Sequence, residues 1–132
     1  MHINLESDYA VRIVYCLAVH GRRMDAAEIA ENVSVTLRFT LKILRKLLEK
    51  SIVKSYKGAK GGYELAKPPE QISMRMVVEA VEGPYMFSRC LSDDYSCARA
   101  ESKNCPFYKV FDDISVIVRR KLDEITFDKL VD

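Results

Sequence analysis

The feature that most constrains the fold is a pair of helical segments separated by only about three residues, SVT. The first segment, DAAEIAENV, begins at Asp25 with Glu28 three positions later, which is a capping-box-like start. The second covers about residues 36–50, with Thr36 at its N-cap position. Its apolar stripe is predicted to consist of leucines, namely Leu37, Leu41, Leu44, Leu47 and Leu48. Two helices joined by so short a turn predict a helix-turn-helix.

A glycine-rich hairpin is predicted after the second helix. Two short β-prone runs, residues 52–56 and 63–66, flank the segment KGAKGG. Three glycines between such runs favour a hairpin whose tip needs positive φ angles, and this tip carries Lys57 and Lys60. Helix, turn, basic helix and basic-tipped hairpin follow the order of a winged helix. We therefore predict a mostly α fold with a small β-hairpin wing.

Further helices are predicted on both sides of this unit. Residues 5–20 and 73–81 have apolar side chains at helical spacing, and Ser73 can cap the second of these helices. From Pro106 an apolar stripe continues to Ile125 along one long helix, after which Thr126 can cap a short turn. This stripe must be buried, and we expect a second copy of the chain to cover it, in preference to its own domain.

Charge is concentrated in the helix-and-hairpin region. Residues 36–63 carry a net charge of +7, whereas the whole chain carries +2. Such a concentration favours a polyanion-binding face over an ordinary solvated helix face.

The chain lacks a Ser–His–Asp arrangement, a phosphate loop and a carboxylate pair, and both histidines lie in or beside the first helix. We therefore do not expect an enzyme. No apolar run reaches about 18 residues and the first residues lack a signal-peptide pattern, so we expect a cytoplasmic protein.

The predicted reading surface is the start of the second helix of the pair together with the hairpin tip. The first residues of such a helix normally face base edges in the major groove. Arg38 has the geometry to bond guanine O6 and N7, and Phe39 either touches a thymine methyl or packs in the core. The lysines of the hairpin tip would reach phosphates or the minor groove. The predicted DNA-binding residues are Thr36, Arg38, Phe39, Lys42, Lys57 and Lys60.

Three of the four cysteines lie in CLSDDYSCARAESKNC, residues 90–105, which has neither helical nor strand periodicity. In a reducing compartment, clustered cysteines bind metal or carry out redox chemistry more often than they form disulfides. The intervals of six and seven residues differ from the paired spacing of a zinc ribbon. Thiolates are soft ligands that suit zinc, copper(I) or an iron–sulfur cluster. Cys16 lies on the apolar face of the first helix, where we expect it to fill the core.

Several stretches together resemble a known family. DYAVRIVYCLAVH, the run from AAEIAENV to VVEAVEG, the three cysteines and the closing ITFDKLVD are similar to the Rrf-type bacterial transcriptional regulators, typified by IscR and NsrR. The resemblance covers nearly the whole chain. It implies a homodimeric regulator with a winged helix-turn-helix domain at 1–82, a cysteine-rich cluster-binding loop at 83–105, and a dimerisation helix with its C-terminal turn at 106–132. It also implies that Arg38, Phe39 and Lys42 contact DNA from the recognition helix and Lys57 from the wing. Ser34 and Lys60 depart from the glycines common in the family, which affects the expected sequence preference.

The resemblance also implies a cofactor, because three cysteines in this loop mark the cluster-binding members. IscR-like members have a histidine three residues after the last cysteine, where this chain has Tyr108. NsrR-like members complete a [4Fe–4S] cluster with an N-terminal aspartate of the other subunit, and Asp8 in ESDYAVR matches that position. Arg12, one helical turn further, can pair with Asp8. The expected ligands of this redox, nitric-oxide or iron–sulfur sensor are Cys90, Cys97, Cys105 and Asp8.

Other interpretations remain open at the level of sequence. The cysteines can serve a thiol or zinc sensor without a cluster, and a winged helix can serve as a protein-interaction adaptor. Asp8 can also be explained as a carboxylate that favours the start of a helix.

Overall fold

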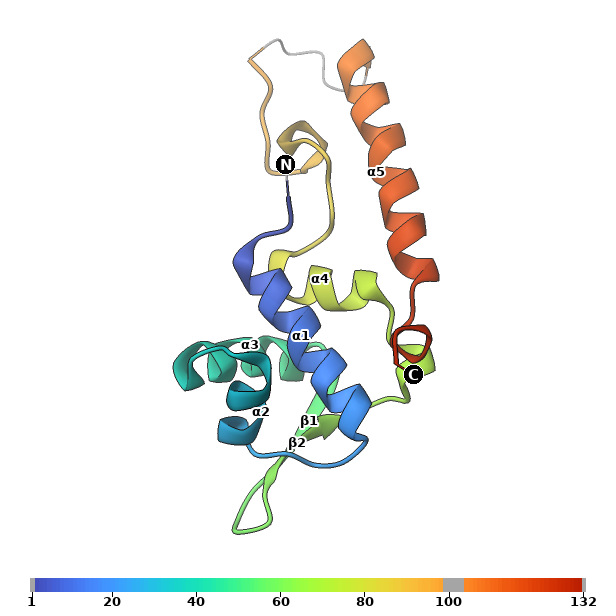
Figure 1. The fold of residues 1–132 in the computed structure, drawn as a ribbon. Coiled ribbons are helices and arrows are strands. Elements are labelled where there is room, and N and C mark those ends of the chain that lie inside the picture. Colours follow the sequence, from blue (N-terminus) through green and yellow to red (C-terminus); the bar gives the residue numbers. More distant parts are fainter. Residues whose placement is uncertain (1, 99–103, 132) are drawn as a thin grey trace.

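The computed structural model describes residues 2–98 and 104–131 of the chain. Helices dominate these residues, and one two-stranded hairpin projects from them (Figure 1). The α-helices and strands, in chain order, are α1 (Leu5–His20), α2 (Ala26–Val33), α3 (Leu37–Glu49), β1 (Val53–Tyr56), β2 (Gly62–Leu65), α4 (Met74–Glu82) and α5 (Pro106–Glu124). Three short 3₁₀ turns among the described residues are η1 (Pro69–Gln71), η2 (Arg89–Leu91) and η4 (Phe127–Lys129). The predicted fold class, a winged helix-turn-helix with a long additional helix, is confirmed.

Polar caps fix where the helices of the winged helix begin. The side chain of Asp25 accepts a hydrogen bond from the backbone N–H of Glu28 at 2.8 Å. Thr36 Oγ1 accepts one from Phe39 at the start of α3, and Ser73 Oγ accepts one from Met76 at the start of α4. Each bond satisfies an amide that has no partner inside its own helix. The three caps predicted from the sequence are therefore confirmed.

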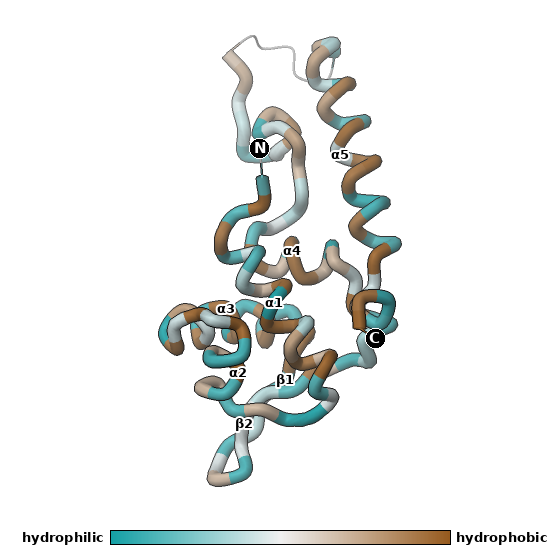
Figure 2. Tube along the Cα trace, viewed as in Figure 1, coloured by the Kyte–Doolittle hydropathy of each residue, from teal (hydrophilic) through white to brown (hydrophobic). Residues whose placement is uncertain are grey.

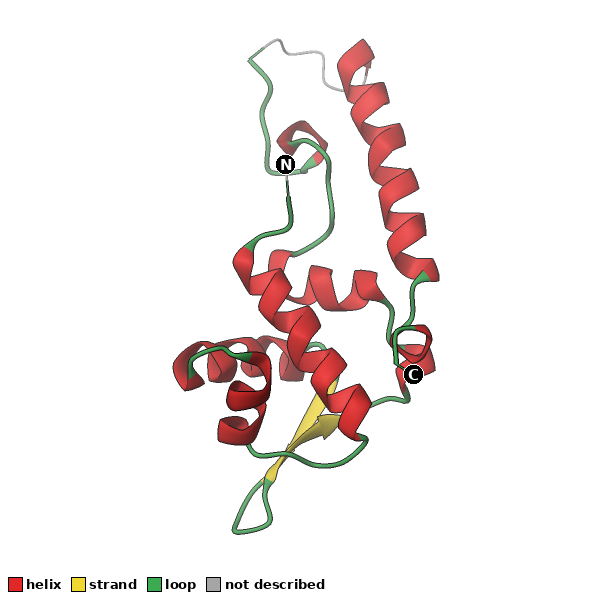
Figure 3. Cartoon of the chain, viewed as in Figure 1, coloured by secondary structure: helices red, strands yellow, loops and turns green. Residues whose placement is uncertain are grey.

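The wing is an antiparallel pair of strands in which Val53 lies opposite Leu65 and Tyr56 opposite Gly62. Gly58 and Gly62 adopt φ angles of 93° and 142°, as the glycine-rich tip predicted. The connection between α1 and α2 runs along the other edge of β2 (Figure 3). There Met24 and Tyr63 exchange two backbone hydrogen bonds, at 2.9 and 2.7 Å. The wing is thereby attached to the segment that precedes the helix-turn-helix.

The core forms where α1 crosses the other helices of the winged helix. The inner face of α1 is fully buried at Ala10, Ile13 and Val14 and packs against α2, α3 and α4. Phe127, far along the chain in η4, is also fully buried and belongs to the same core. The C-terminal turn thus packs with the winged helix. The division into 1–82, 83–105 and 106–132 stays a prediction.

The packed face of α3 differs from the predicted leucine stripe. Thr40, Ile43, Leu44 and Leu47 are buried, whereas the exposed fractions of Leu37 and Leu41 are 46% and 42%. The prediction was therefore wrong for Leu37 and Leu41. Apolar residues occupy more than one face of this helix, and contact with α1 and α2 decides which face is buried.

α5 extends away from the winged helix, and hydrophobic positions, brown in Figure 2, recur along it. Ser115 is the sole buried residue of this helix, all of which is described. Phe107, Val110 and Ile117 remain exposed to 56%, 54% and 64%. The C-terminal end of α5 is fixed to the start of α4, because Met74 N donates to Ile125 O and Phe127 N donates to Ile72 O. No helix in the described part of the chain is long and apolar enough to cross a membrane.

Candidate nucleic-acid interface and cysteine segment

The outer face of α3 combines basic and apolar side chains. Arg38 and Lys42 are exposed and lie four residues apart, so they share one face of the helix. An open hollow on this face is lined by Leu37, Arg38, Leu41, Lys42 and Arg45. Side chains of the kinds that can bind phosphates or guanines thus alternate here with leucines, whose apolar surface is of the kind that can contact a thymine methyl group. Sequence reasoning placed these leucines in the core and so missed this apolar component.

Phe39 takes an intermediate position. Its exposed fraction is 43%, and its ring meets the ring of Tyr9 on α1 edge-on, with centroids 6.2 Å apart. One side of Phe39 is thus supported by α1, while the other side remains accessible to a partner. Of the two predicted roles, core packing accounts for only part of this side chain.

A carboxylate on α1 pairs with the lysines of α3. Glu6 Oε1 lies 2.6 Å from Lys42 Nζ, and Glu6 Oε2 lies 2.6 Å from Lys46 Nζ. Hydrogen bonds from Lys42 and Lys46 hold the pKa of Glu6 below its usual value of 4.5, against a smaller effect of burial. The partners lie 36 and 40 residues apart in the chain, so no local sequence pattern could have predicted this bridge. It connects the first turn of α1 to the proposed reading helix.

The tip of the wing is basic and accessible, since Lys57 and Lys60 are both exposed. At the base of the tip, the guanidinium carbon of Arg23 lies 3.2 Å from the centroid of the Tyr56 ring. Arg23 Nη1 also donates a hydrogen bond to the backbone oxygen of Lys60 at 3.1 Å. Arg23 belongs to the α1–α2 connection and was not among the predicted residues.

The segment that leads to the first loop cysteine is fastened to α5. Phe87 N donates to Ser115 Oγ at 2.8 Å, and Arg119 Nη1 donates to Tyr85 O at 2.9 Å. The rings of Phe87 and Phe111 lie 5.3 Å apart. Cys90 follows directly in η2, so its position depends on α5.

The three loop cysteines differ in their surroundings but are all partly exposed. Cys90 lies in η2, and Cys105 is the N-cap of α5 without a capping hydrogen bond from its side chain. The end of α5 at Cys105 favours negative charge, such as that of a ligating thiolate. Residues 99–103, between Cys97 and Cys105, lie outside the described residues.

The donor set suits a soft metal or an iron–sulfur cluster, because it offers three accessible thiols. Within the described residues, however, no group of three or more His, Cys, Asp or Glu side chains is close enough to hold a metal ion. The residues therefore fit a cluster by the chemistry of their ligand atoms, but not by their present arrangement. Bringing the thiols together requires a change in the loop.

Asp8 lies on α1 with 40% of its side chain exposed. Its carboxylate is 2.8 Å from Arg12 Nη2, which confirms the predicted pair. Arg12 Nη1 also donates to the backbone oxygen of Val33 at the end of α2, at 3.4 Å. Asp8 is thus connected through one side chain to the turn between α2 and α3.

Cys16 is buried on α1, as predicted for a core-filling residue. Burial raises the pKa of its thiol. A buried neutral thiol packs as a small apolar group, and we assign it no ligand role.

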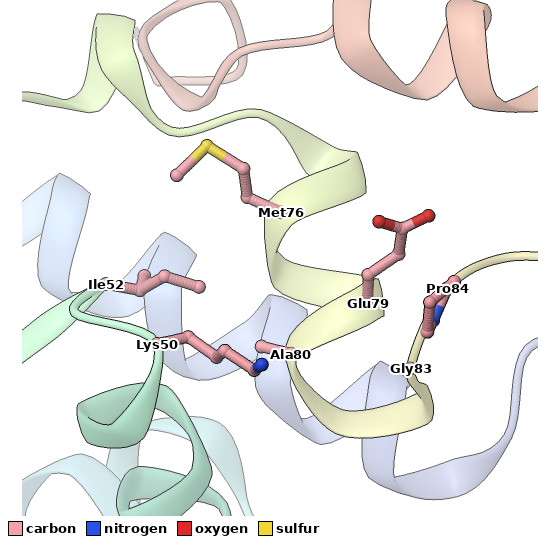
Figure 4. Close-up of a pocket in the computed structure, with 7 residues that line it drawn as sticks. All are labelled: Lys50, Ile52, Met76, Glu79, Ala80, Gly83 and Pro84. Carbon is pink, nitrogen blue, oxygen red and sulfur yellow. The ribbon is translucent and has the colours of Figure 1, made fainter.

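A shallow pocket lies between the α3–β1 connection and α4 (Figure 4). Glu79 is one of the lining residues, and its Oε1 accepts hydrogen bonds from Arg75 Nε and Tyr85 N. Its role is accounted for by the attachment of α4 to the segment that follows it. The residues that line the pocket are Lys50, Ile52, Met76, Glu79, Ala80, Gly83 and Pro84.

Comparison with known proteins gives consistent matches along the whole chain. The model of the Rrf2 family, described as an iron-dependent transcriptional regulator, matches residues 3–132. A Haemophilus influenzae protein named as an HTH-type transcriptional regulator is 31% identical over 99% of this chain and 87% of its own length. IscR of Pectobacterium atrosepticum is 28% identical over 99% of this chain and 79% of its own length. Among solved structures, the oxidized form of Staphylococcus aureus CymR is similar with a TM-score of 0.76 and 25% identity, covering 100% of this chain and 97% of that chain.

Proposed function

This chain belongs to the Rrf2 family of transcriptional regulators, and we propose that it acts as a homodimer that binds an operator in double-stranded DNA and carries a [4Fe–4S] cluster in its cysteine segment. As a member of this family it is a DNA-binding winged-helix regulator and not an enzyme. In this role it would act in the cytoplasm.

The observation that carries the DNA-binding proposal is the accessible basic face of α3 beside a basic wing. Arg38 and Lys42 are exposed at the start of α3, and Lys57 and Lys60 are exposed at the wing tip. We assign base reading to Arg38 together with Phe39, and phosphate contacts to Lys42 and the wing lysines. Thr36 fixes the start of the reading helix through its bond to the amide of Phe39.

The proposed homodimer rests on the exposed apolar face of α5. Residues Val110 and Ile117 lie seven positions apart, so they fall on the same side of the helix, and both are more than half exposed. Pairing of two such helices would remove this surface from water. A dimer also presents two reading helices, which suits successive major grooves about 34 Å apart.

We further propose that Cys90, Cys97 and Cys105 hold the cluster together with Asp8 from across the dimer. When bound, such a cluster supplies a site at which nitric oxide or an oxidant reacts. The carboxylate of Asp8 would be held more weakly than the three soft thiolates, so its position would be the one most open to attack. The 2.8 Å pair with Arg12 uses Oδ2 of Asp8, so ligation would either use Oδ1 or replace this pair.

Contacts within the chain suggest how the presence or loss of the cluster would change the affinity for DNA. Arg12 joins Asp8 to the backbone of Val33, and Glu6 on the same turn joins Lys42 and Lys46. A shift of the first turn of α1 would therefore act on both the helix-turn-helix connection and the reading helix. The proposal requires that the two states of this turn differ in DNA affinity.

A second candidate is a cluster-free thiol sensor. It is favoured by the absence of a ready group of metal ligands among the described residues. The existence of an oxidized form of the similar Staphylococcus aureus CymR also supports redox control without specifying a cluster. A zinc sensor that uses the same thiols is a separate cluster-free alternative, and it would need the thiols to be brought together as a cluster does.

Purification without oxygen, followed by visible spectroscopy and cluster-preserving mass spectrometry, tests the cluster. We expect a broad visible band and a mass increment of four irons and four sulfides, lost in Cys97→Ala and weakened in Asp8→Ala. Cys16→Ala is the matched control and should retain the cluster, because Cys16 is a buried core residue. A colourless protein that reconstitution cannot fill would refute the cluster and leave the thiol or zinc sensor as the candidate.

A further inference from the structure

We propose that Arg23 is a positioning residue for DNA binding, because it braces the wing loop that carries Lys57 and Lys60. Arg23 lies in the connection between α1 and α2, outside both strands of the wing and outside the helix-turn-helix. The inference rests on the proposed role of the wing lysines in contacting phosphates. It assigns to Arg23 an effect on affinity that needs no contact with DNA.

The Arg23 side chain spans the wing loop from one end to the other. Its guanidinium stacks over the ring of Tyr56, the last residue of β1, with 3.2 Å between Cζ and the ring centroid. Its Nη1 donates to the backbone oxygen of Lys60, close to the start of β2, at 3.1 Å. A planar guanidinium suits both contacts at once, because it can stack with its face and donate from its edge.

Apart from Arg23, the wing loop is supported by a backbone hydrogen bond from Gly61 N to Gly58 O at 2.9 Å, and Tyr56 at its start bonds through its hydroxyl to Glu64. Each strand of the wing has only four residues, and an isolated two-stranded hairpin is marginally stable in water. Gly58, inside the loop, has no atoms within 4 Å of where a Cβ would stand. An unbraced loop would have to lose conformational freedom when its lysines bind phosphates, and that loss weakens binding.

The backbone of the wing also lies directly against the brace. A Cβ built on Gly62 would meet the backbone oxygen of Met24 at 2.6 Å and the Cγ of Arg23 at 3.2 Å. The bridge between Met24 and Tyr63 fixes the main chain next to Arg23. The main chain at Arg23 is therefore held in place, so its side chain can restrict the movement of the wing loop.

Arg22 provides a natural control at the neighbouring position. Its guanidinium pairs with the carboxylate of Glu28 on α2 and donates a hydrogen bond to the backbone oxygen of Arg23 at 3.1 Å. Neither of these contacts is with the wing loop. Arg22 and Arg23 carry the same charge in the same connection. A general electrostatic effect on DNA would be similar for both, whereas bracing of the wing belongs to Arg23 alone.

The test uses the full-length protein and a fluorescent duplex of about 30 base pairs, isolated with the wild-type protein from a random-sequence library. We expect Arg23→Ala to weaken binding about three- to tenfold, from the loss of one stacking contact and one hydrogen bond. Tyr56→Leu should weaken binding similarly although it removes no charge. Arg22→Ala should bind like wild type, and thermal unfolding checks that every variant is folded.

A double-mutant cycle separates positioning from direct contact. In a Lys57→Ala/Lys60→Ala background, Arg23→Ala should change the affinity by less than about twofold, because the residues that it positions are gone. If its full effect persists in that background, Arg23 contacts DNA itself and the inference is wrong. Equal losses for Arg22→Ala and Arg23→Ala would also overturn it.

The same measurements separate this inference from the proposed function. If Lys57→Ala/Lys60→Ala weakens binding but Arg23→Ala and Tyr56→Leu do not, only the brace is refuted. If removal of both lysines leaves binding unchanged, the proposed role of the wing fails, and the brace fails with it.

Discussion

The carboxylate of Glu6 on α1 lies 2.6 Å from the ammonium group of Lys42 on α3. Lys42 is one of the proposed DNA contacts. Its ammonium group is therefore already paired with a carboxylate of the protein before it can bind a DNA phosphate. The second carboxylate oxygen of Glu6 engages Lys46 at the same distance. DNA must therefore compete with, or share, a bridge within the protein.

Removal of this internal anion should strengthen DNA binding. Glu6→Gln keeps the size of the side chain but frees the charge of Lys42 and Lys46, and we expect about two- to fivefold tighter binding, the range of a partly exposed ion pair. The measurement is the dissociation constant for an operator duplex as a function of salt. Glu49→Gln makes the same change of charge at the other end of α3, so an equal gain in that variant would contradict a specific role for Glu6.

The same bridge predicts a pH dependence of stability. The pKa of Glu6 is lowered from 4.5 by its lysine partners, so its contribution to stability is complete above that value and is lost as the pH falls through the lowered pKa. The difference in the free energy of unfolding between wild type and Glu6→Gln should be constant from neutral pH to about pH 5 and then shrink. Other carboxylates cancel in this difference. A difference that persists at low pH would show that the bridge does not act through charge.

Arg38 and Lys57 should affect DNA binding in different ways. Arg38→Ala is expected to cost about 1–3 kcal/mol and to relax the preference at one base pair, while Lys57→Ala should weaken binding to all sequences. Binding to a set of single-base operator variants distinguishes the two patterns. If Arg38→Ala retains the affinity and preference of wild type, α3 is not the reading helix as assigned.

Dimerisation should depend on the exposed apolar face of α5. Ile117→Gln replaces an apolar side chain that is 64% exposed, and we expect it to raise the dimer dissociation constant by about tenfold or more, because the buried apolar area is lost. Sedimentation velocity over a range of concentrations measures this shift. Lys121→Gln changes an exposed polar residue of the same helix and should leave the dimer intact. Equal behaviour of the two variants would place the interface elsewhere.

A methyl group at Gly62 should loosen the wing from the α1–α2 connection. Its φ of 142° is unfavourable for other residues, and a Cβ would lie 2.6 Å from Met24 O. We expect Gly62→Ala to lower the free energy of unfolding by about 1–3 kcal/mol. Gly58→Ala carries a similar backbone strain at 93° without a clash, so chemical denaturation should show a smaller loss. A smaller loss at Gly62 than at Gly58 would contradict the close contact.

The elements of this fold could be predicted because their signals are local. Asp25, Thr36 and Ser73 mark helix starts through bonds to amides only three residues away, and the glycines of the wing mark a turn. The apolar stripe of α5 was also evident, because its repeat does not depend on the partner that covers it.

The contacts between elements could not be predicted in the same way. Leu37 and Thr40 both fit a helical pattern, and only packing against α1 and α2 decides that Thr40 is buried and Leu37 exposed. Glu6 and Arg23 likewise gain their roles from partners that lie 36 and 37 residues away. Their importance depends on tertiary structure, and a single sequence carries no signal of it.

The attachment of α5 at its C-terminal end has a mechanical consequence. The helix has 19 residues, which corresponds to a length of about 28 Å. Its base is tied to α4 through Met74 and Phe127, while Cys105 stands at the opposite end. Because α5 is held at its C-terminal end beside the core, a small change in its tilt is amplified at the other end. A tilt of about 5° about the C-terminal end would move the Cys105 end by about 2.5 Å. Conversely, a displacement of the Cys105 end would produce a much smaller displacement at the C-terminal end of α5, where the helix joins the winged helix.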